Sequence, residues 1–399
     1  MYLSLNKKYF EGDISRGFIS LYIGKTVIMI ASGLLGLFLP IFVFNLLDQN
    51  FVLTILYFVA SSVTYGFLVI SGAQFLNSFG FRRSLRASVL FGALFYVIFY
   101  FIDKGNMEYF LPLSILVITF FRLLHWVPYH TDFAKFTDKK NRGKELSSIM
   151  ATGLAISVFI PLAAGAIITK FGFEVLFFIA IILYLVAIVP FATLPHTQEK
   201  FVWSYKKTWK EFFSKKRRGV VFAHMANGAE NLIGVIIWPI FMFQILDGNY
   251  FNVGAISTLV ISVTVVFQLI VGKYLDKPHH KDKVLGWGCF LYSAGWLAKI
   301  FITTAFQIFV AGAYHSIAHI FFRTPDTLTY EMAADEGHYV DEFTVIKEMA
   351  VHFGKIIAAA LIILLSMFFA LQWTFLLAAM ATLVLVLLRS RGEELKVSQ

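Results

Sequence analysis

The sequence has little charge and almost no cysteine, and each scarcity excludes a class of protein. Of its 399 residues only 15% are charged, whereas 58% are hydrophobic and the mean hydropathy is +0.74. A soluble domain is nearer a quarter charged, so this chain cannot hide its apolar surface from water, and we expect lipid to be its solvent. The one cysteine, Cys289, excludes an internal disulfide and a metal site built from several thiolates.

Long apolar runs are what the sequence has in abundance. A spanning helix takes about 20 residues, and backbone groups in lipid must be satisfied internally, which favours helices. The runs predict an all-α membrane protein with twelve spans, over 17–45, 51–76, 85–102, 109–134, 146–169, 173–194, 219–246, 250–275, 284–305, 307–331, 343–369 and 371–388. These spans nearly exhaust the chain, so we expect no soluble domain. The polar residues 1–16 and the long run after them predict no cleavable signal peptide.

The distribution of Lys and Arg predicts the orientation of the spans. If the N-terminus is cytoplasmic, 26 of the 34 basic residues lie in cytoplasmic segments and only Lys104 and Lys170 lie on the other side. Positive charge collects on the cytoplasmic side of membrane proteins, so we expect the inner membrane and two cytoplasmic termini. The same bias explains the pI of about 9.4 without a nucleic-acid partner.

The longest polar segment, 195–218, separates two halves of six predicted spans each, residues 1–194 and 219–399. Aromatic residues alternate with lysines along it, which suits either an amphipathic helix on the inner leaflet or a positively charged connector.

The second half repeats the first. Residues 40–50 and 239–249 share 7 identities in 11 positions at an offset of 199, where apolar composition alone gives about one. Two halves in parallel repetition are the arrangement of transporters whose halves rock about a central site.

Twelve spans, a basic central loop and this repeat resemble the major facilitator superfamily. That family carries a Gly-x-x-x-Asp-Arg/Lys signature after spans two and eight. Gly272, Asp276 and Lys277 match it after span eight, whereas after span two Arg82 fits but Asn77 stands in the place of the Asp. The resemblance implies that these five residues form a conformational latch at the cytoplasmic ends, which in the first half lacks its charge.

Polar side chains inside the spans are the candidate site, because an ionisable group at mid-bilayer costs several kcal/mol unless it is paired or hydrated. The resemblance implies that spans one, four, seven and ten line a central cavity, and most of these residues lie there. We predict that the substrate site consists of Lys25, Arg122, His125, Asn227, Glu230, His319 and Arg323. Span eleven adds Glu348, His352 and Lys355 at helical spacing.

The deep charges are mostly positive, since Lys25, Arg122, Arg323 and Lys355 stand against Glu230. Such a cavity attracts anions, and arginine offers two parallel donors to a carboxylate or phosphate. Glu230, His315, His319 and His352 are suited to proton coupling, because their charge can change near neutral pH.

The leading hypothesis is therefore a monomeric, proton-coupled secondary transporter of a small or amphipathic organic anion that works by rocker-switch alternating access without a cofactor. A structural Lys25–Glu230 pair is an alternative use of two of these charges. His315 and His319, one helical turn apart, leave a divalent-metal transporter open, although Arg323 would repel the metal.

Other classes of function remain as alternatives. The 17% aromatic content favours a multidrug exporter, against which the cationic cavity argues. Dispersed histidines and the lack of a Ser-His-Asp or Gly-x-Ser-x-Gly arrangement argue against an intramembrane enzyme. The deep charges argue against a non-transporting scaffold.

Overall fold

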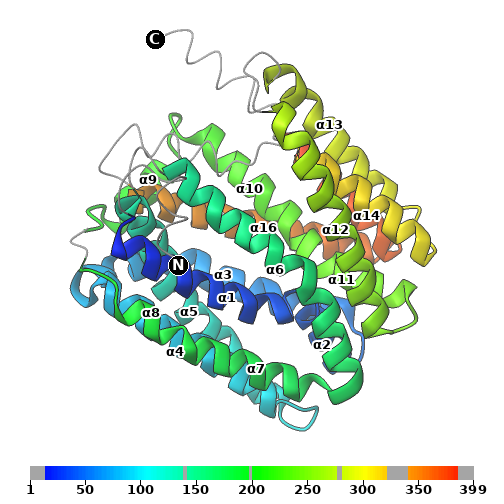
Figure 1. Ribbon diagram of the computed structural model, residues 1–399, viewed down its shortest axis with the longest axis horizontal. Coiled ribbons are helices and arrows are strands. Elements are labelled where there is room, and N and C mark those ends of the chain that lie inside the picture. The colour runs from blue at the N-terminus through cyan, green and yellow to red at the C-terminus, as the bar shows by residue number, and fades with distance from the viewer. Residues whose placement is uncertain (1–13, 138–141, 197–199, 276–280, 321–339, 385–399) are drawn as a thin grey trace, which may run out of the picture.

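The computed structural model describes residues 14–137, 142–196, 200–275, 281–320 and 340–384, and within them the secondary structure is helical (Figure 1). The helices of the first half are α1 (Arg16–Gly36), α2 (Leu39–Leu46), α3 (Phe51–Phe79), α4 (Phe81–Phe101), α5 (Met107–Phe136), α6 (Arg142–Phe171), α7 (Phe173–Val186) and α8 (Ile188–Ala192). The linker contributes α9 (Tyr205–Phe212). The second half contains α10 (Arg218–Leu232), the π-helical turn η2 (Ile233–Ile237), α11 (Trp238–Ile245), α12 (Tyr250–Leu275), α13 (Lys281–Lys299), α14 (Ala305–Ile320), α16 (Val340–Ser366) and the 3-10 turn η4 (Leu371–Thr374).

Nine helices of the described residues are long and apolar enough to cross a membrane. They are Arg16–Leu46, Phe51–Phe79, Phe81–Phe101, Met107–Phe133, Lys144–Phe171, Phe173–Ala192, Arg218–Ile245, Tyr250–Ile270 and Asp341–Ser366. Nine predicted spans are thereby confirmed as membrane-length helices. At the other three predicted spans lie α13, α14 and the shorter apolar helix Leu371–Val384, so the count of twelve stays a prediction.

Prolines account for the breaks inside three of these spans. The first span bends between α1 and α2 just before Pro40, and the sixth bends between α7 and α8 before Pro190. In the seventh span the π-helical turn η2 ends at Ile237, two residues before Pro239. Proline has no N–H to donate and its ring crowds the carbonyl four residues earlier, so the preceding turn must rearrange.

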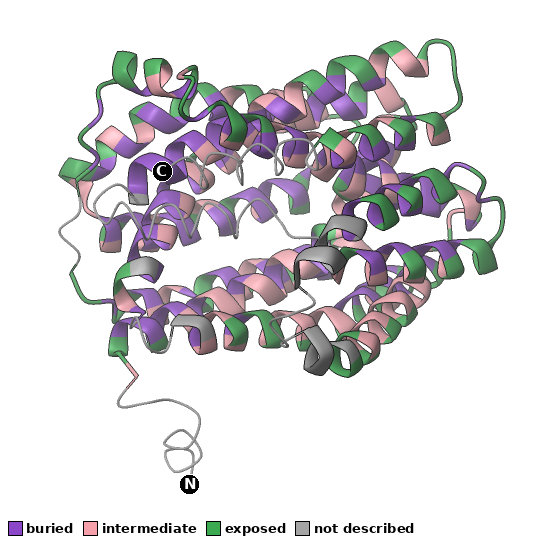
Figure 2. Cartoon of the chain, turned by 90° about the horizontal axis from the view of Figure 1, so that it is seen from above, coloured by how far each residue is buried: buried purple, intermediate pink, exposed green. Residues whose placement is uncertain are grey.

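The helices run side by side. Helices α4, α7 and α8 lie at one side of Figure 1 and the pair α13 and α14 at the opposite side, with α6 between them. Buried and exposed positions alternate along most of them, which suits helices with one face toward protein and one toward lipid (Figure 2).

Small residues let helices of the two halves approach closely at α6 and α12. A Cβ atom added to Gly254 would lie 2.2 Å from the carbonyl oxygen of Pro161, and one added to Gly165 would lie 2.6 Å from that of Tyr250. Leu162 also donates its backbone N–H to the hydroxyl of Thr258 at 3.1 Å. The α6–α12 contact therefore depends on glycine, as in other membrane helix pairs.

The other close contact between the halves joins α3 to α16. A Cβ atom added to Gly66 would lie 3.3 Å from that of His352, and the rings of Tyr65 and His352 meet at 4.7 Å between centroids. A buried apolar cluster includes residues of α3, the linker and α16, so the linker belongs to the packed interior at this end.

Helix α9 packs against protein through one face. Thr208 and Phe212 are buried, and the Trp209 ring lies 6.0 Å from Phe67 of α3 and 5.6 Å from Phe353 of α16. The linker thus packs between the halves. The lysines of α9 are exposed, on the face away from Thr208 and Phe212.

Candidate functional site

A cavity of about 190 Å³ lies between the two halves. It is lined by residues of α1, α2, α3, α4, α5, α10, η2 and α16, namely Ser32, Leu35, Gly36, Leu39, Pro40, Phe58, Ser61, Ser62, Tyr96, Arg122, Asn231, Leu232, Val235, Ile236 and Lys355. Its polar lining consists of two cations, hydroxyls and one amide. None of the described lining residues carries a carboxylate.

Arg122 reaches the cavity from α5, in the first half. Its Nη1 donates a hydrogen bond to the Ser61 hydroxyl at 3.2 Å. Tyr57, Tyr65 and Glu348 lie within electrostatic range of the guanidinium. The remaining N–H groups of a guanidinium form a planar fork that suits an oxyanion.

Lys355 reaches the same cavity from α16, in the second half. It lies within electrostatic range of both Arg122 and Glu348. Glu348 is buried and does not line the cavity. Two cations, one from each half, therefore face a common space, and a buried carboxylate lies within electrostatic range of both.

Lys25 and His125, which we predicted to bind substrate, do not line this cavity. The Lys25 Nζ lies 4.8 Å from the centre of the Trp126 ring and 4.9 Å from that of Tyr129, which are cation–π distances. His125 is 1% exposed and its Nδ1 lies 3.2 Å from the Ser88 hydroxyl. His125 thus belongs to the interior of the first half, and Lys25 is half-buried against α5.

Glu230 occupies a separate polar cluster in the second half. The Tyr292 hydroxyl donates to Glu230 Oε1 at 2.7 Å, and the His315 ring stacks on the Tyr292 ring at 4.3 Å. His319 contacts the same ring at 5.0 Å. Three of the four predicted coupling residues thus meet around Tyr292.

Lys299 is the cation of this cluster. It is 3% exposed, and its Nζ lies 3.7 Å from the centre of the Trp296 ring and 4.2 Å from that of Trp238. Glu230 lies within electrostatic range of it. The fourth predicted coupling residue, His352, lies elsewhere, against Tyr65 in the α3–α16 contact.

The remaining predicted site residues are accounted for as follows. Asn227 is half-buried on α10 and does not line the cavity, whereas Asn231, one turn further on, does. Arg323 lies outside the described residues. The structure adds Lys355, Ser61, Ser62, Tyr96 and Asn231 to the lining. Two of these had a signal in the sequence: Lys355 through its charge inside a span and its spacing from Glu348 and His352, and Asn231 as a polar residue of the seventh predicted span.

The structure describes three of the five predicted latch residues, Arg82, Asn77 and Gly272. Arg82 Nη1 donates to the Leu194 carbonyl oxygen at 3.4 Å, which joins α4 to the end of α8 within the first half. Asn77 binds the backbone of Phe201 in the linker. Gly272 lies within α12, and Asp276 and Lys277 lie outside the described residues.

The alternative metal site gains no third ligand in the described part of the chain. No group of three or more His, Cys, Asp or Glu side chains there could hold a metal ion together, and His315 and His319 both contact the ring of Tyr292.

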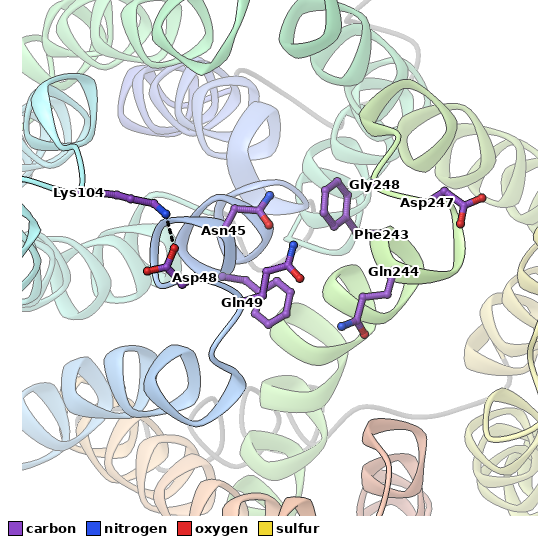
Figure 3. A pocket seen from close by; sticks show the side chains of 9 residues that line it. Asn45, Asp48, Gln49, Lys104, Phe243, Gln244, Asp247 and Gly248 are labelled. Carbon is purple, nitrogen blue, oxygen red and sulfur yellow. Dashed lines mark hydrogen bonds and ion pairs between the residues drawn. The ribbon is translucent and has the colours of Figure 1, made fainter.

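A wider pocket of about 750 Å³ lies where the matched segments 40–50 and 239–249 turn (Figure 3). Eight of its lining residues form pairs at the offset of 199, namely Phe44 with Phe243, Asn45 with Gln244, Asp48 with Asp247 and Gln49 with Gly248. Lys104 also lines it and forms an ion pair with Asp48.

The two turns around this pocket share one backbone conformation. Asp48 and Gln49 have φ values of 52° and 60°, and Asp247 and Gly248 have 52° and 75°. Gln49 N donates to Phe44 O at 2.8 Å, and Gly248 N donates to Phe243 O at 2.9 Å. Matched sequence gives matched structure here, while the repeat over the rest of the two halves stays a prediction.

Membrane-length helices that enclose a polar cavity define a multi-pass membrane protein of the transporter class. The family model described as Major Facilitator Superfamily matches residues 21–229 and 219–398, which together are nearly the whole chain. This chain therefore belongs to the Major Facilitator Superfamily, whose members are transporters rather than enzymes and move small-molecule solutes across a lipid bilayer. No curated protein matches the sequence.

Proposed function

We propose that this chain is a proton-coupled secondary transporter that binds a small organic anion between Arg122 and Lys355. The observation that supports this most directly is the lining of the central cavity. Arg122 of the first half and Lys355 of the second half face it together with hydroxyl and amide groups, and no carboxylate is among its described lining residues.

The electrostatics of such a cavity favour an anion. A buried cation is costly unless opposite charge or hydrogen-bond acceptors surround it. Glu348, which does not line the cavity, offsets part of the charge of Arg122 and Lys355. A carboxylate or phosphate entering the cavity supplies the rest, with two parallel bonds to the guanidinium and one to the ammonium.

The size of the cavity favours a small substrate. A volume of about 190 Å³ holds roughly six water molecules, since each occupies about 30 Å³ in the liquid. The apolar lining by Phe58, Leu35, Leu232, Val235 and Ile236 suits a short hydrocarbon portion attached to the anionic group.

The contribution of one cation from each half supports alternating access. An anion that bridges Arg122 and Lys355 draws the halves together around itself, and the empty cavity leaves two like charges facing each other. Substrate binding can therefore bias the rocking of residues 1–194 against residues 219–399, because it interacts differently with the two arrangements.

Proton coupling is assigned in this proposal to the cluster of Glu230, Tyr292, His315 and His319. These groups can take up and release a proton, and they lie in one half, apart from the anion site. Asn231 lines the cavity and neighbours Glu230 on α10, so a change at Glu230 can reach the substrate through that helix.

Location and orientation complete the proposal. The 26 basic residues on one side against 2 on the other favour the inner membrane, with both termini in the cytoplasm, and a monomer suffices because both cations come from one chain.

A thermal-shift screen of the purified protein tests the substrate class. The protein is scanned at two pH values against small carboxylates and phosphates, divalent metals and lipophilic cations, beside the Arg122→Ala variant. We expect an anion to raise the melting temperature of the natural protein and to leave that of the variant unchanged. Stabilisation by a metal or a lipophilic cation, with none by anions, would overturn the assignment.

A further inference from the structure

The central linker crosses from one half to the other at the end where α3 finishes and α16 begins. Residues 201–203 run between Asn77 and Gln74 of α3 and Glu342 of α16. We call residues 201–203 the strap.

Asn77 holds the strap through an amide that both donates and accepts. Its Nδ2 donates to the Phe201 carbonyl oxygen at 2.8 Å, and its Oδ1 accepts from the Phe201 N–H at 2.8 Å. A carboxylate accepts hydrogen bonds but has none to donate. An ionised Asp at position 77 could therefore keep only one of these two bonds.

The next two strap residues alternate between the halves. Val202 donates its N–H to Glu342 Oε1 at 3.0 Å, and the Trp203 carbonyl oxygen accepts from Gln74 Nε2 at 3.2 Å. The backbone of three consecutive residues is thus bound by both halves.

The far end of the linker folds back on the strap and contacts α16 of the second half. The Arg217 guanidinium lies 5.0 Å from the centre of the Trp203 ring and 4.4 Å from that of Phe343, and its Nε pairs with Glu211 at 3.0 Å. Both Trp203 and Arg217 are nearly fully buried. Burial of so much of a connector is unexpected if it only joins two domains.

We infer that the strap is a latch, which ties α3 to α16 and keeps this end of the transporter closed until it releases one half. The closure follows from the contacts, since separation of α3 from α16 must break the bonds to Asn77 or those to Glu342. The release rests on the alternating access proposed above.

Hydrogen–deuterium exchange of the full-length protein tests whether Asn77 holds the strap against α3. Asn77→Asp keeps the size of the side chain and the acceptor for Phe201 N–H but removes the donor to its carbonyl. Loss of one such bond accelerates exchange of the Phe201 and Val202 amides about tenfold. Asn252→Asp, the same change at an exposed asparagine of α12, is the matched control and leaves both amides unchanged.

A second pair of variants tests the contact of the strap with α16 in the second half. Glu342→Ala removes the acceptor for Val202 N–H and accelerates its exchange to a similar extent, whereas Glu342→Gln retains an acceptor oxygen and does not. Peptides of α6 report on the overall fold, and their exchange stays constant. If Asn77→Asp also accelerates amide exchange in α6, that variant has disturbed the overall fold. The comparison of Glu342→Ala with Glu342→Gln then tests the strap instead.

Cysteine labelling then tests whether the strap holds the halves together. Ser32→Cys places a thiol on the cavity in a Cys289→Ser background, and an impermeant maleimide is added from the strap side of the membrane. We expect labelling several-fold faster with Asn77→Asp than with Asn252→Asp. Unchanged exchange at Phe201 and Val202, or faster exchange with unchanged labelling, would each overturn the latch, and neither readout depends on a substrate.

Discussion

The hydroxyl of Tyr292 donates a 2.7 Å hydrogen bond to the carboxylate of Glu230, and so joins α13 to α10 inside the second half. This bond turns the predicted coupling carboxylate away from the central cavity. In the proposed function the anion and the proton therefore have separate sites, and their coupling would pass through movement of α10 rather than through direct contact.

Glu230→Gln removes the charge at this position and keeps the size and the acceptor for Tyr292. We expect the variant to lose proton-driven accumulation of substrate and to keep substrate exchange. Uptake into proteoliposomes with an imposed pH gradient measures the first, and counterflow at equal pH measures the second. Glu108→Gln, at the start of α5, is the control. Full response of the Gln variant to the gradient would move the coupling role to His315, His319 or His352.

Tyr292→Phe removes only the hydroxyl and keeps the ring on which His315 stacks. It leaves a buried carboxylate short of a donor, so we expect a loss of about 1–3 kcal/mol in stability and a lower accumulation ratio. Thermal unfolding and the same uptake assay measure these effects. A variant with unchanged melting temperature would show that the 2.7 Å bond contributes nothing to the folded state.

Gly228→Ala tests the close packing of α10 on α16. The added Cβ would lie 2.0 Å from the Val351 carbonyl oxygen, so the helices must separate, at a cost of about 1–3 kcal/mol. Gly219→Ala on the same helix meets nothing within 4 Å and is the matched control. We expect a lower melting temperature only for Gly228→Ala. Equal melting temperatures would mean that α10 and α16 are further apart than the structure has them.

The orientation is tested with topology reporters. A reporter fused after Gln399 should be active in the cytoplasm, and a tag inserted at Gly105, between α4 and α5, should be accessible from outside. An external C-terminus would contradict twelve spans that start from a cytoplasmic N-terminus.

The long helices could be predicted because span length and apolarity are properties of the local sequence. Partners across the bundle could not. Lys299 illustrates the difference, since it lies between two indoles: Trp296 is three residues away on α13, but Trp238 is 61 residues away. Nothing local in the sequence brings the second ring to it.

The site was predictable to a similar degree. Arg122 was identified from its depth and charge, and it does line the cavity. Lys25 has the same properties, but the rotation of α1 turns it toward Trp126 and Tyr129. Ser61 gave no signal, because a serine in a helix commonly bonds its own backbone, as Ser61 does with Phe58 O at 2.9 Å.

The central claim is that Arg122 and Lys355 together bind the transported anion, and counterflow in proteoliposomes tests it most directly. The substrate is the anion that gives the largest thermal shift, and Arg83→Ala, an exposed cation at the start of α4, is the control. The account predicts that Arg122→Ala and Lys355→Ala each reduce counterflow at least about tenfold, and that Arg122→Lys restores little because a point charge lacks the planar fork. Counterflow at the natural rate in both Ala variants, with normal folding, would contradict it.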